Sequence, residues 1–214
     1  MTKKVSPKTC RGVRRGERLT NCSHDRCGRR YNAFTLIELI VVVGIIIVLA
    51  GLVLSTVGYA RKKGARARAE TEIAAMSAAL ENYKADNAAY PYNNDTNGLD
   101  PRTRGDPNDT ADPTYSNSSV YLYVQLSGDS ARNRNPTGKS YMQFKPNMLL
   151  PAGGTGTVTA VADPFGNSYG YSTAANPQAN PTPAGTPGYN PTFDLWSTAT
   201  GTTTTDAPKW IKNW

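Results

Sequence analysis

The sequence predicts an α+β protein in which one long N-terminal helix lies on a small antiparallel β-sheet. Three observations lead to this prediction. Residues 39–57 are uncharged and strongly apolar, the stretch after them keeps an apolar stripe at helical spacing, and short strand-like runs separated by glycine and proline follow. We expect three parts: a basic leader at residues 1–33, a transmembrane helix at 34–58, and a globular head at 59–214 that includes the second half of the helix.

The positive charge of the chain is concentrated in its first part. Residues 1–33 contain ten basic and two acidic residues, which equals the net charge of +8 of all 214 residues. Residues 34–214 therefore carry equal numbers of basic and acidic side chains. Because nonspecific binding to nucleic acid depends on positive charge, the neutral body argues against a nucleic-acid partner.

The cysteines and the only histidine also lie in this first part, at Cys10, Cys22, His24 and Cys27. Thiolates and imidazole are zinc ligands, so a zinc site is one interpretation, although the spacing matches no common zinc module. The other interpretation is a set of reduced thiols on a segment that is later removed. In that case the mature chain has no cysteine and needs no disulfide.

Residues 39–57 form a stretch of 19 uncharged residues, which predicts a transmembrane helix because about 20 residues cross the hydrocarbon core. A buried core helix would need a comparable apolar partner, which the rest of the sequence lacks. An ordinary secretory signal would be followed by small residues, whereas Tyr59 and Arg61-Lys62-Lys63 follow here. By the positive-inside rule, the basic first part is cytoplasmic and the head is exported.

The helix should continue beyond the apolar stretch, because residues 60–89 are rich in alanine, glutamate, lysine and arginine. An apolar stripe recurs at spacings of three and four, at Ile73, Met76, Leu80 and Tyr83, and it should pack on the head. The helix should end at Tyr90-Pro91, since the residue before proline is disfavoured in a helix.

The remaining elements of the head are short. We expect a polar loop at 92–118, and a helix rather than a strand at 120–124, capped by Ser118 or Ser119. A Pro/Gly/Asn-rich loop at 176–191 and an exposed low-complexity segment at 202–205 follow. The predicted strands lie within residues 157–162, 168–172 and 193–197.

Glu38 is the one carboxylate in the apolar part of the helix, where a charged group is costly and is therefore a functional candidate. Cleavage after Ala33 would create a partner for it, namely the α-amino group of Phe34. In an array of packed helices, Glu38 of one subunit can pair with the Phe34 amine of a neighbour, which favours assembly in one register. A monomeric membrane anchor would need the helix but not Glu38.

The string Phe34-Thr35-Leu36-Ile37-Glu38, between a basic segment and an apolar span, resembles the type IV pilin and pseudopilin family. The resemblance implies cleavage between Ala33 and Phe34 by prepilin peptidase and N-methylation of Phe34. It also implies a single-pass protein of the bacterial inner membrane, with its head in the periplasm. The family usually has glycine where this chain has Ala33, and many members have proline where it has Ser55.

Further blocks are most similar to the major pseudopilin of type II secretion, at residues 82–91, 97–99, 163–171 and 211–214, whereas 100–147 looks like an insertion. The resemblance implies a pseudopilus subunit that polymerises with itself and with other pseudopilins on an inner-membrane assembly platform. The alternative within the family is a major or minor subunit of a type IV pilus.

The resemblance also implies a calcium-binding C-terminal loop, for which residues 197–209 offer one carboxylate, Asp206. Calcium takes six to eight oxygen ligands, so we expect a metal-free loop, with Asp206 as the ligand if calcium binds. Catalysis is not expected, because the mature chain lacks histidine and cysteine. Asp163 and Asp194 are the candidate carboxylate pair, but Asp163-Pro164 is better interpreted as a turn.

Overall fold

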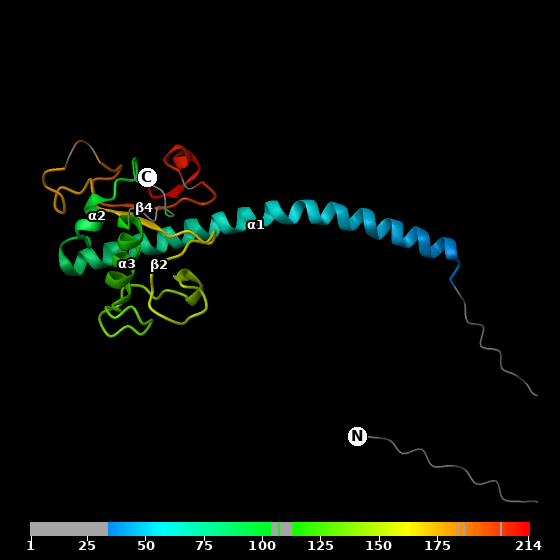
Figure 1. The fold of residues 1–214 in the computed structure, drawn as a ribbon, viewed down its shortest axis with the longest axis horizontal. Helices are drawn as coiled ribbons and strands as arrows, with labels where there is room; N and C mark the ends of the chain where they lie inside the picture. Colours follow the sequence, from blue (N-terminus) through cyan, green and yellow to red (C-terminus); the bar gives the residue numbers. More distant parts are fainter. Residues whose placement is uncertain (1–33, 104–106, 108–112, 184, 186, 202) are drawn as a thin grey trace, which may run out of the picture. The chain divides into compact units, whose positions relative to one another are not determined.

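The computed structural model describes residues 34–103, 107, 113–183, 185, 187–201 and 203–214. The basic segment 1–33, with Ala33, the cysteines and His24, lies outside the described residues. The chain divides into two compact units, Met1–Val48 and Leu49–Trp214. The second unit contains every strand of the described residues (Figure 1).

Helix α1 comprises Leu36–Asn87, which confirms the predicted long helix to within two residues at each end. Its N-terminal turn is capped by Thr35. Its C-terminal end is set by Ala88, whose φ of 61° lies in the left-handed region and whose N–H donates to the Lys84 carbonyl at 2.8 Å. The predicted stop at Tyr90-Pro91 is therefore slightly late, because a left-handed residue ends the helix before the proline can.

The predicted apolar stripe of α1 is confirmed in the second unit. Ile73, Met76 and Leu80 are buried in the main core, and Tyr83 is partly buried against it. The same face is fixed by a polar contact, since the buried Tyr169 hydroxyl donates to Glu72 Oε2 at 2.8 Å. This face of α1 is therefore held to the sheet by both apolar packing and a hydrogen bond.

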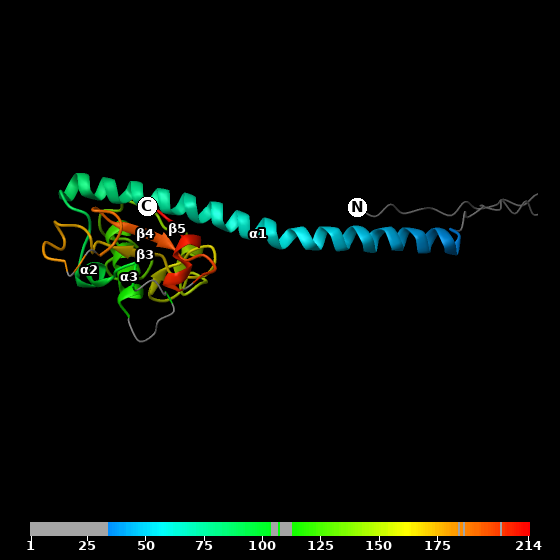
Figure 2. The ribbon, with the colours of Figure 1, turned by 90° about the horizontal axis from the view of Figure 1, so that it is seen from above.

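Two small antiparallel sheets form the β part. One pairs β1 (Leu149–Leu150) with β2 (Ala160–Val161), and the other has the order β3 (Gly170–Ser172), β4 (Asp194–Ser197) and β5 (Ile211–Lys212). In Figure 2 the three-stranded sheet lies between α1 and the shorter helices α2 and α3. The predicted runs contain β2, β3 and β4, so the α+β architecture is confirmed, whereas β1 and β5 were not predicted.

Two helices occupy part of the region predicted as a loop. Helix α2 comprises Asn94–Gly98, and Asn93 caps it by accepting the Thr96 N–H at 2.9 Å. Helix α3 comprises Thr114–Ser127, which confirms the helix over strand at 120–124. The predicted loop at 92–118 is therefore wrong in both places.

The predicted serine cap of α3 is also wrong, because the helix already begins at Thr114 and its N-cap residue, Pro113, makes no side-chain cap. Ser118 donates from Oγ to the Thr114 carbonyl at 2.8 Å. Ser119 Oγ accepts the Val161 N–H at 3.0 Å. Both serines are therefore buried inside the helix, where their hydroxyls have protein partners.

The described part of the C-terminal segment has two short 3-10 helices, η1 (Pro146–Met148) and η2 (Thr204–Lys209). The start of η2 falls in the segment predicted to be exposed low-complexity chain, of which Thr203 and Thr205 are exposed. A second core cluster lies at this end of the unit and consists of Leu99, Tyr115, Trp196 and Trp210. Residues 100–147, predicted to be an insertion, contribute Tyr115, Leu122 and Leu126 to the two cores.

Candidate functional site

The N-terminal part of α1 presents an apolar surface on all sides. Every large hydrophobic side chain between Phe34 and Leu54 is at least 45% exposed. Within the described residues, α1 is the one helix that is long and apolar enough to cross a membrane. A soluble protein does not normally leave such a surface uncovered, so a membrane or a protein partner is expected to cover it.

Glu38 is the only charged residue of this surface before Arg61. Its Oε2 accepts both the Thr35 N–H and the Thr35 hydroxyl, each at 2.9 Å. In return, the Glu38 N–H donates to Thr35 Oγ1 at 3.3 Å. This reciprocal arrangement is a capping box, which satisfies backbone donors at the start of a helix.

Thr35 is a site residue that the sequence analysis missed. The signal was present, since threonine followed three residues later by glutamate, just before an apolar run, is the pattern of a capping box. The carboxylate also lies in the first turn, where the partial positive charge of the helix dipole favours an anion. Glu38 therefore has a local structural role at the start of α1.

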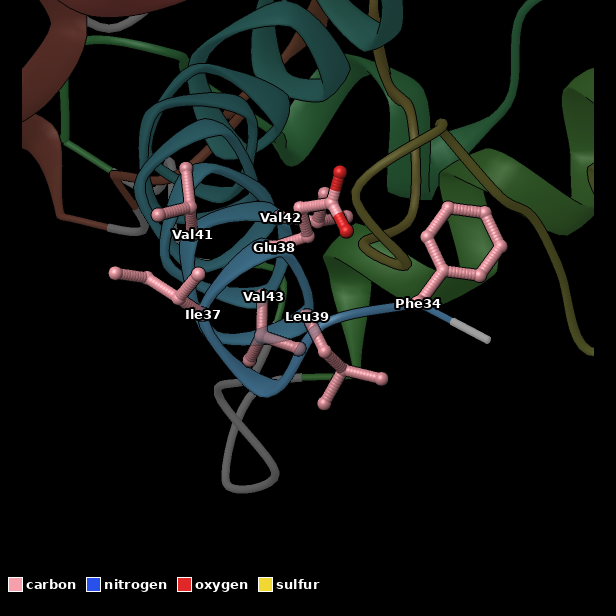
Figure 3. Close-up of a pocket in the computed structure, with 7 residues that line it drawn as sticks. All are labelled: Phe34, Ile37, Glu38, Leu39, Val41, Val42 and Val43. Carbon is pink, nitrogen blue, oxygen red and sulfur yellow. The ribbon is translucent and has the colours of Figure 1, made fainter. Parts of the chain in front are cut away.

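Figure 3 shows the surroundings of the Glu38 carboxylate, which lies on the same side of the helix as the Phe34 ring, whereas Ile37 and Val41 lie on the other side. The concave surface here is lined by Phe34, Ile37, Glu38, Leu39, Val41, Val42 and Val43. Glu38 is its only charged lining residue. Among the described residues, both Thr35 donors reach Oε2, which leaves Oε1 able to accept a further donor. The geometry therefore provides one hydrogen-bond acceptor of negative charge in apolar surroundings.

The residues at 197–209 do not fit a calcium site. Asp206 Oδ1 lies 2.8 Å from the Lys209 ammonium, and Oδ2 accepts the Thr203 hydroxyl at 2.8 Å. The Lys209 ammonium and the Thr203 hydroxyl hold the pKa of Asp206 below its usual range. No group of three acidic, histidine or cysteine side chains occurs anywhere in the described part of the chain. A lone carboxylate already paired with a cation lacks the oxygen ligands that calcium requires.

The candidate carboxylate pair has structural partners instead of a shared site. Asp163 accepts the backbone N–H groups of Phe165 and Asn167 in its own turn, as the interpretation of Asp163-Pro164 predicted. Asp194 accepts those of Tyr189 and Asn190. Burial raises the pKa of both carboxyls. Each carboxylate thus organises one loop of the second unit.

Comparison with known proteins finds one matching family and several similar proteins with a common name. Residues 28–54 match the family described as the prokaryotic N-terminal methylation motif. The type II secretion system core protein G of Escherichia coli K12 is 32% identical over 137 residues, which covers 61% of this chain and 87% of that protein. No solved structure matches the chain.

Other relatives with the same name match over shorter stretches. The protein from Pectobacterium carotovorum is 39% identical over 69 residues, 32% of this chain, and that from Dickeya chrysanthemi is 40% identical over 63 residues, 29% of this chain. These alignments span 44% and 41% of the two relatives' own lengths.

Proposed function

Because the chain belongs to the type IV pilin-like family that includes type II secretion system core protein G, we propose that it is a structural subunit of a type II secretion pseudopilus. The chain is inserted in the bacterial inner membrane through residues 34–58 and is cut by prepilin peptidase between Ala33 and Phe34. It then polymerises through its N-terminal helix, with copies of itself and with other pseudopilins, on an inner-membrane platform. It is a structural protein and not an enzyme.

The observation that carries this proposal is the single carboxylate of Glu38 in the exposed apolar surface. A charged group at the centre of a membrane helix costs about 2.5–3.5 kcal/mol on insertion scales, and less near its end. A partner of opposite charge offsets that cost. The amine created on Phe34 of a neighbouring subunit is such a partner, and it reaches Glu38 in one register only.

The capping box prepares the carboxylate for this role. Thr35 holds Oε2, so the side chain has few alternative conformations to lose when a neighbour arrives. Since Oε1 has no donor among the described residues, an incoming amine adds to the bonds of the carboxylate and need not displace Thr35. The cap and the contact between subunits are therefore compatible.

The replacement Glu38→Gln tests the proposal, because glutamine serves in a capping box as well as glutamate does. The variant keeps the helix start and deletes only the charge. In the assembled state it leaves the Phe34 amine of the neighbour unpaired, and breaking a buried pair in this way costs about 3–5 kcal/mol. We expect the variant to insert in the membrane and to lose more than nine-tenths of the cross-links between cysteines placed on adjacent helices.

Glu70→Gln is the matched control, since it makes the same chemical change on the same helix. Glu70 is exposed and lies 3.5 Å from Arg66 in a surface ion pair, which contributes little to stability. Its cross-linked ladders should equal those of the wild type. Undiminished ladders in Glu38→Gln would remove Glu38 from assembly and contradict the proposal.

A further inference from the structure

Three consecutive cations, Arg61, Lys62 and Lys63, lie on α1 within the second unit, a few residues after its apolar surface ends. All three are exposed. Successive residues of a helix are about 100° apart, so these side chains spread over more than half of its circumference. We refer to Arg61, Lys62 and Lys63 as the basic collar.

The basic collar differs from the next cations on the helix in having no ion pair among the described residues. Arg66 lies 3.5 Å from Glu70, and Arg68 lies 2.7 Å from Glu72. No acidic residue occurs in the sequence between Glu38 and Glu70, so the collar has no carboxylate within helical reach. Its charge is therefore available to a partner outside the chain.

The residues just before the basic collar indicate where that partner lies. Leu49, Leu52 and Leu54 belong to the same unit and are largely exposed, and Tyr59 is 73% exposed. An apolar stretch, then a tyrosine, then cations is the order found where a helix leaves a bilayer. Tyrosine lies at the membrane–water interface, and lysine and arginine extend their charged ends to the lipid headgroups.

We propose that the basic collar binds the phosphate groups of anionic phospholipids in the leaflet next to the head, an inference that rests on the membrane insertion of the proposed function. A second copy of the chain fits less well, because several of its carboxylates already pair with cations of their own chain. Within the described residues, Glu70, Glu72, Asp86 and Asp206 each already lie within ion-pair distance of a cation. A phospholipid surface supplies negative charge all around the helix, which matches the spread of the collar.

The test is lipid selectivity of the full chain, purified in mild detergent with equimolar phosphatidylglycerol and phosphatidylcholine. Bound lipids are counted by mass spectrometry. Wild type should retain phosphatidylglycerol in excess, and Lys62→Gln/Lys63→Gln should lose most of this preference, at about fivefold in affinity for each charge removed. The preference should also weaken in 1 M salt, where the Debye length falls to about 3 Å.

The matched control is Arg132→Gln/Lys145→Gln, which removes two exposed cations from the head and should leave the preference unchanged. Extraction of the membranes with alkaline carbonate tests membrane insertion separately from lipid binding by the basic collar. A chain that carbonate releases would overturn the proposed function itself. A retained chain without phosphatidylglycerol preference, or with equal loss in both variants, would overturn the collar inference alone. A collar variant that keeps its lipids but loses cross-links to other subunits would also overturn the inference, because the partner of the basic collar would then be a second copy of the chain.

Discussion

Gly170 illustrates how single residues determine the packing of the second unit. It pairs with Trp196 across β3 and β4, and a Cβ atom at this position would lie only 2.2 Å from the indole ring of Trp196. Trp196 is buried, with Tyr115 5.7 Å and Trp210 6.1 Å away between ring centroids. The indole therefore cannot move aside, and only glycine fits beside it.

We predict that Gly170→Ala destabilises the second unit by at least the 1–3 kcal/mol that is typical of overpacking a core. Thermal unfolding of the full chain in detergent, followed by circular dichroism, should show a fall in Tm of several degrees. Gly64→Ala is the opposite control. Gly64 is an exposed residue of α1 with nothing within 4 Å of the added carbon, so alanine should stabilise the helix by up to about 1 kcal/mol. Equal effects of the two substitutions would contradict this account of Gly170.

At the scale of the elements, the segment at 197–209 is held by protein groups. The Lys209 ammonium pairs with Asp206. Arg66 of α1 donates to the Lys209 carbonyl at 2.9 Å, and the Trp210 indole N–H donates to the Gly201 carbonyl at 2.9 Å. One carboxylate oxygen and one carbonyl oxygen of this segment thus already accept from cationic side chains of the chain itself.

We predict that calcium has little effect on the stability of the protein. Binding to the folded state alone would raise the free energy of unfolding with ligand concentration. The Tm in excess calcium should therefore stay within about a degree of the Tm in chelator, because the oxygen ligands for a tight site are missing. A rise of many degrees with calcium would contradict the prediction and make Asp206 the first residue to replace.

The long helix and the runs that contain β2, β3 and β4 could be predicted from the sequence, whereas α2, β1 and β5 could not. The stripe Ile73, Met76 and Leu80 has the period of a helix and is buried as predicted. The first part of α3 was not predicted as helix because its residues are mostly polar. The buried hydroxyl of Ser119 is satisfied by the Val161 N–H, which is distant in sequence and therefore gives no local signal. The two-residue strands β1 and β5 carry no pattern of their own and exist because β2 and β4 offer them partners.

The candidate site could also be predicted in part. Glu38 stood out because a lone charge in an apolar run is costly, and that cost is visible in the sequence. Its hydrogen bonds to Thr35 follow from the spacing of threonine and glutamate in the sequence, which is that of a capping box. The sequence shows that 197–209 offers one carboxylate, but the pairing of Asp206 with Lys209 depends on the conformation of η2 and could not be predicted.

The net charge of the protein would change with the proposed processing. All of the net charge of +8 belongs to residues 1–33, and residues 34–214 are neutral. The proposed cleavage after Ala33 would therefore convert a basic precursor into a neutral subunit. Such a subunit can pack against its copies without a net charge that opposes assembly.

We predict that the protein extracted from membranes has the mass of a chain that begins at Phe34, with one added methyl group. Isoelectric focusing should show the corresponding shift from the sequence pI of about 9.4 toward neutrality. Cells that lack the prepilin peptidase are the control and should contain the uncut chain. A mature protein that still contains Cys10 or Cys27 would contradict both the cleavage site and the proposed function.

The clustering of the tryptophans also determines what the intrinsic fluorescence of the protein can report. The chain has three tryptophans, and Trp210 and Trp214 lie 6.1 and 6.0 Å from Trp196 between ring centroids. At such separations an excited indole passes its energy to its neighbours, so the emission comes from one place, where Trp196 of β4 meets the two tryptophans that flank β5. Since α1 contains no tryptophan, this emission follows the opening of the C-terminal segment and is insensitive to association of the helices.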